Sequence, residues 1–508
     1  MLPQIQQHLP PVSALVMTLV GFCLSMAIIP FILLKFASRM SHRRELHQTH
    51  KMPVPRLGGI PLGITFIVAS VVAYFWIPGG PTPESARIGI TVTTLLMLGL
   101  GLWDDFSALG ARKKLIGQIL IALLAFAWGM RIETFKNPLT SHVYQFGFGF
   151  SILATVLWLV AMTNLINLID GIDGLAGGIS LMLMLLLAYV GGAQHPFLCG
   201  IAMAIGGALL GFLRYNFPPA KIYLGDGGAY MLGFLIGALS LQNSNKGSIA
   251  AALIAPVFAL GLPILDVALS ILRRGLQGLP IFRPDRRHIH HRLLHAGFSR
   301  QRAVLTLYAI SIVLLGIALI AFWSEGRLTP ILFGCAFLLL LVITPSLGLI
   351  RNWLTVGNVL GNSFEMRREV QYALLLRTCL EREAERCESV EELCGELQTM
   401  ARKLGFAELR LDAADGLRHW TAADIPEGEL IEAKHELHVE GKVVHLTLKA
   451  SLLVMNERKF DVLSELVAEA WLQASRRWSK SRNLPFAFEK KPDKAPALPD
   501  AGTVGSVG

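Results

Sequence analysis

Four polar side chains recur at every third position in the segment 164–173, between two long apolar stretches. They are Asn164, Asn167, Asp170 and Asp173. Residues three apart are neighbours on a helix surface, so these side chains can meet on one face. Amides can recognise a nucleobase or a sugar, and carboxylates can bind a metal ion or accept a proton. A polar network between helices is the alternative, but two carboxylates at a bilayer edge are costly to bury, which favours a functional site.

An adjacent acidic pair, Asp104 and Asp105, ends another apolar stretch, and the basic residues Arg112, Lys113 and Lys114 follow it. Neighbouring carboxylates repel each other unless a cation neutralises them. Their hard oxygen atoms suit Mg²⁺, which usually keeps several waters and bridges to substrate phosphates. A solvated loop at a helix end is the alternative. The acidic pair opposes the basic trend of its loop, and we therefore interpret it as functional.

A further acidic residue, Asp226, lies in a glycine-rich turn that follows Asn216, two prolines and Tyr223. An aspartate in such a turn is a plausible ligand for Mg²⁺, and the ring of Tyr223 can stack on a nucleobase. Taken alone, the segment fits an ordinary turn in which Asp226 caps the next helix equally well.

Two basic segments complete the set of candidate binding residues. The first holds Lys51 and Arg56 before a glycine pair, and the second holds His288, His290, His291 and Arg292. Such cations can hold phosphate oxygens or clamp a diphosphate. The alternatives are an anchor that sets membrane orientation for the first and a basic patch on anionic lipid for the second. Clustered histidines also suggest zinc, but no cysteine and no His-Glu-x-x-His arrangement accompanies them.

The elements that must position these residues are long apolar segments. The 508-residue chain is 53% hydrophobic and 16% charged, whereas a soluble domain carries about a quarter charged residues. We predict an all-α polytopic membrane protein with about eleven spans, each near the roughly 20 residues that cross a bilayer. The predicted spans are 11–36, 57–77, 86–103, 114–130, 149–168, 175–192, 197–213, 228–241, 248–271, 303–323 and 329–350.

Alternate loops between these segments are basic: 37–56, 104–113, 214–227 and 272–302. Lys and Arg concentrate in cytoplasmic loops, so the N-terminus is predicted outside and the C-terminal region in the cytoplasm. Every polar segment described above then falls on the cytoplasmic side, which supports one composite site. Orientation explains much of the net charge of +10, so the charge requires no nucleic acid.

The composition changes to that of a soluble domain near residue 363. We predict a transmembrane domain over 1–350, a hinge over 351–363, a cytoplasmic α+β domain over 364–482 and a disordered tail over 483–508. Helices are expected at 364–386, 390–404 and 458–478, and strands at 406–411, 434–439 and 443–448. This order loosely resembles a GAF-like sensor domain. It carries no catalytic constellation, so a regulatory role with an unidentified ligand or protein partner is the hypothesis.

Taken in order, the polar segments of residues 10–350 resemble the polyprenyl-phosphate N-acetylhexosamine-1-phosphate transferases of glycosyltransferase family 4. The segment 284–293 looks like the His-x-His-His signature of the GlcNAc-1-phosphate branch rather than the triple histidine of the peptidoglycan branch. The resemblance implies Mg²⁺ (with Mn²⁺ as an alternative), a UDP-N-acetylhexosamine donor and undecaprenyl phosphate as acceptor. It also implies a bacterial inner-membrane enzyme that starts a surface polysaccharide of the O-antigen, capsule or teichoic-acid type.

The resemblance further implies roles for individual residues. Metal binding is implied for Asp105 and Asp226, and catalysis for Asp104, Asp105, Asp170 and Asp173. Substrate binding is implied for Lys51, Lys114, Asn164, Asn167, Asn216, Tyr223, His288, His290, His291 and Arg292. Which aspartate acts as the base is left open.

Three other functions remain as alternatives. The nearest is a phospho-MurNAc-pentapeptide transferase of peptidoglycan synthesis. A secondary transporter would carry its carboxylates near the bilayer midplane, often within inverted repeats, and no repeat is visible here. An inactive membrane sensor is the third, although the motifs look intact. A homodimer is compatible with the sequence but is not indicated by it.

Overall fold

The computed structural model describes most of the chain, and its contacts divide the protein into two compact units. The second unit contains everything from Thr355 onward. The described residues are 11–36, 54–77, 80, 82–136, 142–192, 195–243, 256–277, 293, 297–324, 328–346, 356–413, 416–422, 429–439, 442–484 and 486.

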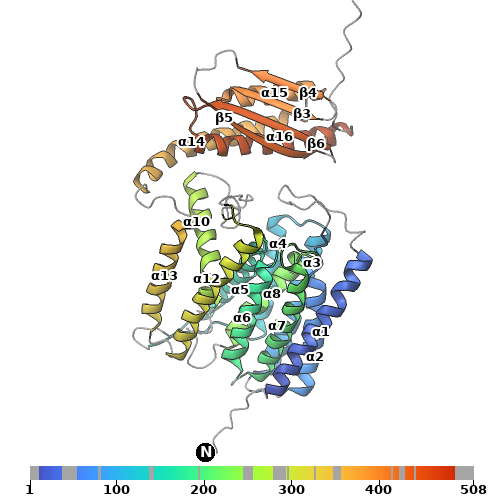
Figure 1. The fold of residues 1–508 in the computed structure, drawn as a ribbon, viewed down its shortest axis with the longest axis vertical. Coiled ribbons are helices and arrows are strands. Elements are labelled where there is room, and N and C mark those ends of the chain that lie inside the picture. The colour runs from blue at the N-terminus through green and yellow to red at the C-terminus, as the bar shows by residue number, and fades with distance from the viewer. Residues whose placement is uncertain are drawn as a thin grey trace, which may run out of the picture. The chain divides into compact units, whose positions relative to one another are not determined.

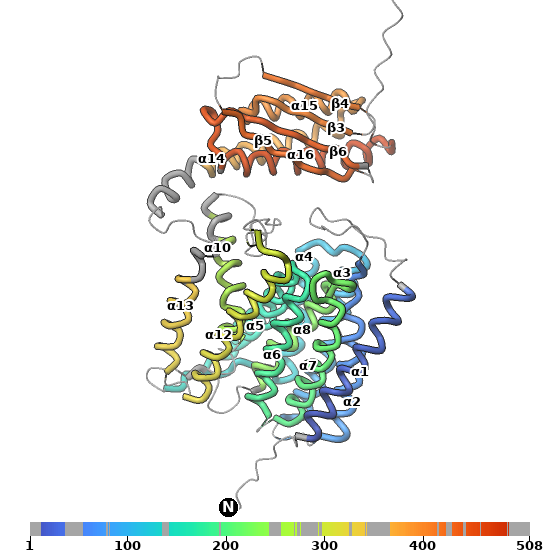
Figure 2. The backbone as a smooth tube through the Cα atoms, in the orientation of Figure 1, coloured from blue at the N-terminus to red at the C-terminus, as the bar shows by residue number. Residues whose placement is uncertain are grey.

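The first unit is helical, and most of its helices run alongside one another (Figures 1 and 2). Each predicted apolar segment contains a helix among the described residues. The helices are α1 (Pro11–Phe36), α2 (Gly59–Trp76), α3 (Glu84–Phe106), α4 (Ala111–Ala127), α5 (Phe148–Ile169), α6 (Leu175–Gly191), α7 (Pro196–Asn216), α8 (Gly225–Asn243), α10 (Gly261–Gln277), α12 (Arg300–Trp323) and α13 (Thr329–Ser346).

Six helices in the described part of the chain are long and apolar enough to cross a membrane, namely α1, α2, α3, α5, α7 and α12. The apolar helices α6 and Thr329–Leu340 of α13 are shorter. The chain therefore has the character of a multi-pass membrane protein. The figure of eleven spans stays a prediction, since α4, α6, α8, α10 and α13 do not meet the same length and hydropathy limits.

Helix α8 lies in the interior of this unit, which accounts for its short, glycine-rich sequence. All its residues from Gly227 to Gln242 are buried, and it packs against α2, α3, α5 and α6. Glycines let its first turn approach its neighbours: a Cβ on Gly101 of α3 would lie 2.4 Å from the Asp226 carbonyl oxygen, and one on Gly59 of α2 would lie 2.5 Å from the Gly228 nitrogen. The beginning of α8 is thus wedged between the end of α3 and the start of α2.

A small hairpin that the sequence analysis missed lies between α4 and α5. Its strands β1 (Thr134–Lys136) and β2 (Val143–Gln145) pair antiparallel. Strands of three residues carry too short an alternation to be recognised from sequence.

The second unit combines helices with one antiparallel sheet, in agreement with the predicted α+β class. Helices α14 (Val356–Glu383), α15 (Val390–Lys403) and α16 (Glu457–Arg482) accompany strands β3 (Glu408–Ala413), β4 (Gly416–Thr421), β5 (Leu430–Val439) and β6 (Lys442–Ser451). The strand order is β4-β3-β6-β5. Strand β4 was not predicted, and α14 begins inside the segment predicted as a hinge.

The core of the second unit follows from alternation along its strands. Leu409 and Leu411 of β3 and Leu446 and Leu448 of β6 are buried, pair across the two strands and share one core with Trp471 of α16. The residues adjacent to these leucines in sequence, such as Arg410 and His445, point to the other face and are exposed. Of the predicted tail, Asn483, Leu484 and Phe486 are described, and the rest lies outside the described residues.

Candidate active site

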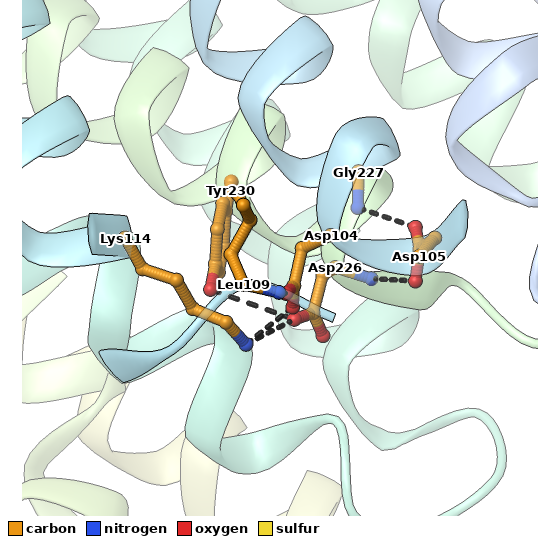
Figure 3. A network of polar contacts seen from close by, with 7 residues as sticks. All are labelled: Asp104, Asp105, Leu109, Lys114, Asp226, Gly227 and Tyr230. Carbon is orange, nitrogen blue, oxygen red and sulfur yellow. Dashed lines mark hydrogen bonds and ion pairs between the residues drawn. The ribbon is translucent and has the colours of Figure 1, made fainter. Parts of the chain in front are cut away.

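Three predicted site residues meet where α3 ends and where α4 and α8 begin (Figure 3). The ammonium group of Lys114 on α4 forms ion pairs with the carboxylates of Asp104 and Asp226, and its Nζ lies 3.2 Å from Asp226 Oδ2. Asp104 and Asp226 are separated by more than 120 residues in the sequence. Two carboxylates from different helices thus share a single cation.

The position of Asp104 is fixed by the loop that follows it. Its Oδ1 accepts a 2.6 Å hydrogen bond from the backbone N–H of Leu109, while its Oδ2 faces Lys114. Its side chain is 7% exposed. Asp104 is therefore a buried, oriented carboxylate whose charge is balanced only in part, because Lys114 also serves Asp226.

Asp105 holds the first turn of α8 (Figure 3). Its two oxygens accept hydrogen bonds from the backbone N–H groups of Asp226, at 2.9 Å, and Gly227, at 2.8 Å. The first N–H groups of a helix lack partners within the helix, and its dipole favours a negative charge at this end. Asp105 thereby sets the position of Asp226, whatever further role it has in metal binding or catalysis.

The other predicted pair of carboxylates lies in the turn between α5 and α6. Asp170 follows the last residue of α5, and Gly174, with φ of +82°, starts α6. Burial raises the pKa of the Asp170 carboxyl well above its usual range, and the negative charges of Asp226 and Asp105 raise it further. This electrostatic influence places Asp170 near the cluster at the start of α8.

Asp173 contacts the loop that leads from α7 to α8. Its Oδ2 accepts a 3.1 Å hydrogen bond from the Ala220 N–H and lies 3.9 Å from Nη1 of Arg300, the first residue of α12. Three segments distant in sequence therefore meet at Asp173.

The side chain of Asn216 stabilises this arrangement. It is 2% exposed. Its Oδ1 accepts from the Gly174 N–H at 2.9 Å, and its Nδ2 donates to the Ile222 carbonyl at 2.8 Å. The side chain joins the 170–174 turn to the loop before α8. The predicted substrate contact of Asn216 would come in addition to these bonds and stays a prediction.

Tyr223 is tied by its backbone to the segment before α2. Its N–H donates to the Pro55 carbonyl, and its own carbonyl accepts from Gly58. Burial raises the pKa of the phenol to about 12; the charge of Asp173 adds to this, and the charges of Arg300 and Arg56 oppose it. The ring therefore lies among charged groups of the site, where the sequence analysis expected a stacking platform.

The two asparagines of the segment 164–173, Asn164 and Asn167, make different contacts in the structure. Asn164 Nδ2 donates to Gln118 Oε1 on α4 at 2.7 Å and to the Val160 carbonyl at 2.8 Å. Asn164 thus links α5 to α4. The carbonyl of Asn167 accepts a bond from the Asp170 N–H. Nucleotide recognition by either residue stays a prediction.

Several contacts of the site were not predicted from the sequence. Tyr230, one turn into α8, reaches Asp226 Oδ2 with its hydroxyl over a long 3.5 Å. Gln118 lies one turn after Lys114 on α4, so its spacing was a usable signal. Arg300, Gln301 and Tyr308 on α12 gave none, because their partners lie more than 80 residues away.

Five predicted substrate-binding residues cannot be placed. Lys51, His288, His290, His291 and Arg292 all lie outside the described residues.

The donor set suits a hard divalent cation. Asp104, Asp105, Asp170, Asp173 and Asp226 lie around this end of the helical unit with Lys114, Arg56 and Arg300, so the carboxylates outnumber these cations. In the described part of the chain, no three or more His, Cys, Asp or Glu side chains converge tightly enough to enclose a metal ion. Mg²⁺ needs no such cage, because it is commonly held by one or two carboxylates, waters and substrate phosphates. Asp104 and Asp226, already converging on one cation, fit that mode.

Comparison with known proteins places this site in context. The sequence profile of glycosyl transferase family 4 matches residues 87–244, which include every acidic residue named above. The chain is 34% identical over 269 residues to a Bacillus subtilis protein named "Probable undecaprenyl-phosphate N-acetylglucosaminyl 1-phosphate transferase", covering 52% of this chain and 73% of that protein.

Two further relatives have different names. The decaprenyl-phosphate N-acetylglucosaminephosphotransferase of Mycolicibacterium smegmatis is 32% identical over 333 residues, which cover 60% of this chain and 80% of that protein. The phospho-N-acetylmuramoyl-pentapeptide-transferase of Moorella thermoacetica is 33% identical over 285 residues, covering 52% of this chain and 83% of that protein.

Proposed function

The chain belongs to glycosyl transferase family 4, and on this premise we propose that it transfers N-acetylhexosamine-1-phosphate from a UDP-sugar to undecaprenyl phosphate. The donor sugar we favour is GlcNAc, and the second product is UMP. The observation that carries the proposal is the convergence of Asp104 and Asp226 on Lys114 inside the family-matched segment.

The reaction exchanges one diphosphate linkage for another. An oxygen of the lipid phosphate attacks the sugar-linked phosphorus of the UDP-sugar, the bond from that phosphorus to the bridging oxygen breaks, and UMP leaves with the electron pair. Both substrates are anions, so a catalyst must offset their mutual repulsion and hold them in line. Lys114 and Arg56 are the cations that we propose for this role, with the basic segments around Lys51 and His290 as further candidates.

Asp226 and Asp104 are the residues we expect to hold Mg²⁺, with Asp105 acting through the first turn of α8. When bound, the ion would neutralise charge on the diphosphate. Burial raises the pKa of the Asp170 carboxyl, and strongly shifted pKa values are common among groups that transfer protons in active sites. Asp170 and Asp173 are the candidates for that proton transfer, and the choice between them stays open.

We further propose that the site faces the cytoplasm of a bacterial inner membrane, with the N-terminus outside. The distribution of Lys and Arg among the loops supports this orientation. A UDP-sugar donor would be supplied from that side. The apolar helices of the first unit offer the prenyl chain a lipid-like surface.

A donor panel tests the proposal. Purified protein with undecaprenyl phosphate and Mg²⁺ is given radiolabelled UDP-GlcNAc, UDP-GalNAc or UDP-MurNAc-pentapeptide. We expect label from a UDP-HexNAc in the lipid fraction. Label from UDP-MurNAc-pentapeptide instead would favour the second candidate, which the relative from Moorella thermoacetica supports. Absence of label from every donor would contradict both.

A reverse assay provides an independent check. Because the linkages broken and formed are of the same kind, excess UMP added to the purified lipid product should regenerate UDP-sugar. If no UDP-sugar forms while the forward reaction proceeds, the proposed chemistry is wrong.

A further inference from the structure

The first three turns of α12 contact the candidate active site at three points. Tyr308 donates its hydroxyl hydrogen to the Gly174 carbonyl, Gln301 Nε2 donates to the Pro218 carbonyl at 2.9 Å, and Arg300 Nη1 lies 3.9 Å from Asp173 Oδ2. The helix start is itself fixed, since the Ser299 side chain accepts from the Arg302 N–H. One rigid element thus reaches both the 170–174 turn and the proline loop before α8.

The contact of Tyr308 depends on a glycine in α6. A Cβ on Gly178 would lie 1.9 Å from the Tyr308 hydroxyl oxygen. The Gly174 carbonyl that accepts from Tyr308 also accepts from the Gly178 N–H, at 2.9 Å. The absence of a side chain at Gly178 is therefore what lets the tyrosine reach the turn that carries Asp170 and Asp173.

The contacts of α12 add to hydrogen bonds that already join the 170–174 turn to the loop before α8. Asp173 accepts from the Ala220 N–H, Asn216 ties Gly174 to the Ile222 carbonyl, and α12 holds both sides of this junction. Helix α12 thus adds contacts to both the turn and the loop, beside the Asp173 and Asn216 bonds that join the two directly.

We propose that Arg300, Gln301 and Tyr308 are positioning residues for the transfer reaction, which set the 170–174 turn and hence the Asp173 carboxylate against the loop before α8. The catalytic part of this inference rests on the proposed function. A misplacement of about 1 Å in a catalytic geometry can cost on the order of 100-fold in rate. Residues that position the 170–174 turn therefore influence turnover without touching substrate.

The chain offers a matched control on the same two helices. At the far ends of α6 and α12, Trp323 Nε1 donates to the Tyr189 hydroxyl at 3.1 Å. Tyr308→Phe and Trp323→Phe therefore each remove one side-chain hydrogen bond between α6 and α12, the first at the site and the second away from it.

We expect Tyr308→Phe to lower kcat about tenfold, the equivalent of roughly one hydrogen bond, with KM for the UDP-sugar changed less than twofold. Trp323→Phe should leave both constants unchanged. Arg300→Lys should retain most of the turnover that Arg300→Gln loses, because a cation beside Asp173 is preserved. A kcat of Tyr308→Phe equal to wild type, or an equal loss in both phenylalanine variants, would overturn the catalytic role.

Hydrogen exchange separates this inference from the proposed function. In Tyr308→Phe, amides of residues 174–178 should exchange faster than in wild type, whereas Trp323→Phe should leave them unchanged. If wild-type protein transfers no sugar phosphate but shows this difference, the proposed function fails and the positioning of the turn stands. If exchange is the same in all three proteins, the positioning role is wrong, whatever the activity.

Discussion

The candidate active site of the first unit and the sheet of the second unit arrange their carboxylates in opposite ways. At the site, Asp104 and Asp226 converge on the single ammonium group of Lys114. On the sheet, Glu408 meets both Lys449 Nζ, at 2.8 Å, and His419 Nε2, at 2.9 Å. A carboxylate that shares its cation with another remains incompletely neutralised, whereas Glu408 has partners in excess.

We propose that this difference distinguishes a ligand-binding site from a surface that is stable without a ligand. The carboxylates of the first unit are held close to one another by helix packing and by hydrogen bonds such as those that Asp105 accepts from the first backbone N–H groups of α8. The repulsion between them costs folding free energy, and such a cost is typical of sites where a ligand later relieves it. The charged face of the sheet needs no ligand to be stable. Substitutions of matched type in the two regions should therefore have very different consequences.

The largest difference is expected for removal of a carboxylate charge. Asp226→Asn should reduce transfer by at least about 1000-fold, since it removes a carboxylate that we expect to hold the Mg²⁺ ion that would neutralise the diphosphate. The thermal midpoint should stay level or rise, because the substitution removes one of the two negatively charged carboxylates that repel each other beside Lys114. Radiolabel transfer and a melting curve measure the two effects.

The matching change on the sheet is Asp412→Asn, an exposed aspartate paired with Arg410. It should leave transfer unchanged, because a surface ion pair contributes only about 0–1 kcal/mol to the stability of the fold. Neither residue of the pair belongs to the candidate site. Wild-type turnover by Asp226→Asn would show that the comparison of the two regions has no functional meaning.

The next largest difference concerns the shared cation. Lys114→Met leaves Asp104 and Asp226 facing each other without it, so we expect transfer to fall at least about 100-fold and the thermal midpoint to drop. Added Mg²⁺ should then stabilise this variant more than wild type, since the ion can take the place of the ammonium group. Melting curves with and without Mg²⁺ measure this.

Lys449→Met is the control on the sheet, where it removes one of the two partners of Glu408. Its midpoint should fall only slightly and should not respond to Mg²⁺ beyond the wild-type response. A Lys114→Met variant with the Mg²⁺ response of wild type would argue against metal binding by Asp104 and Asp226.

The contrast also explains how much the sequence could predict. Apolar segments are local patterns, and each of those predicted contains a helix. The acidic residues were found for the same reason, because a charge at the end of an apolar segment is conspicuous in sequence. The resemblance to family 4 was confirmed by the family match and the relatives.

The partners of those residues were not predictable from local patterns. The hydrogen bond from the Asp226 N–H to Asp105 joins residues 121 positions apart, and that from the Tyr308 hydroxyl to the Gly174 carbonyl joins residues 134 apart. Nothing local distinguishes an aspartate that positions a helix from one that faces a ligand. The functions of Asp105 and Asn216 beyond their observed bonds therefore remain predictions, as does the GAF-like character of the second unit.

The smallest expected effect is a pH dependence confined to the sheet. The hydrogen bond from Lys449 lowers the pKa of Glu408, and His419 acts in the same direction. A carboxyl whose folded pKa is lowered stabilises the fold above its ordinary pKa, here 4.5, and that stability is lost as the pH falls through the lowered folded value. The contribution should be about 0.5 kcal/mol for a pair at the surface.

Lys449→Met tests this without reference to activity. Hydrogen exchange of the β3 amides in the intact chain, corrected for intrinsic rates, should show protection falling between neutral pH and pH 3 in wild type and a flatter profile in the variant. The amides at the start of α8, which are bonded to Asp105, serve as an internal reference and should be indifferent to Lys449. If the β3 profiles coincide, Glu408 gains nothing from its surplus of partners. The two regions would then differ only in how their carboxylates are crowded, and no longer in how they are neutralised.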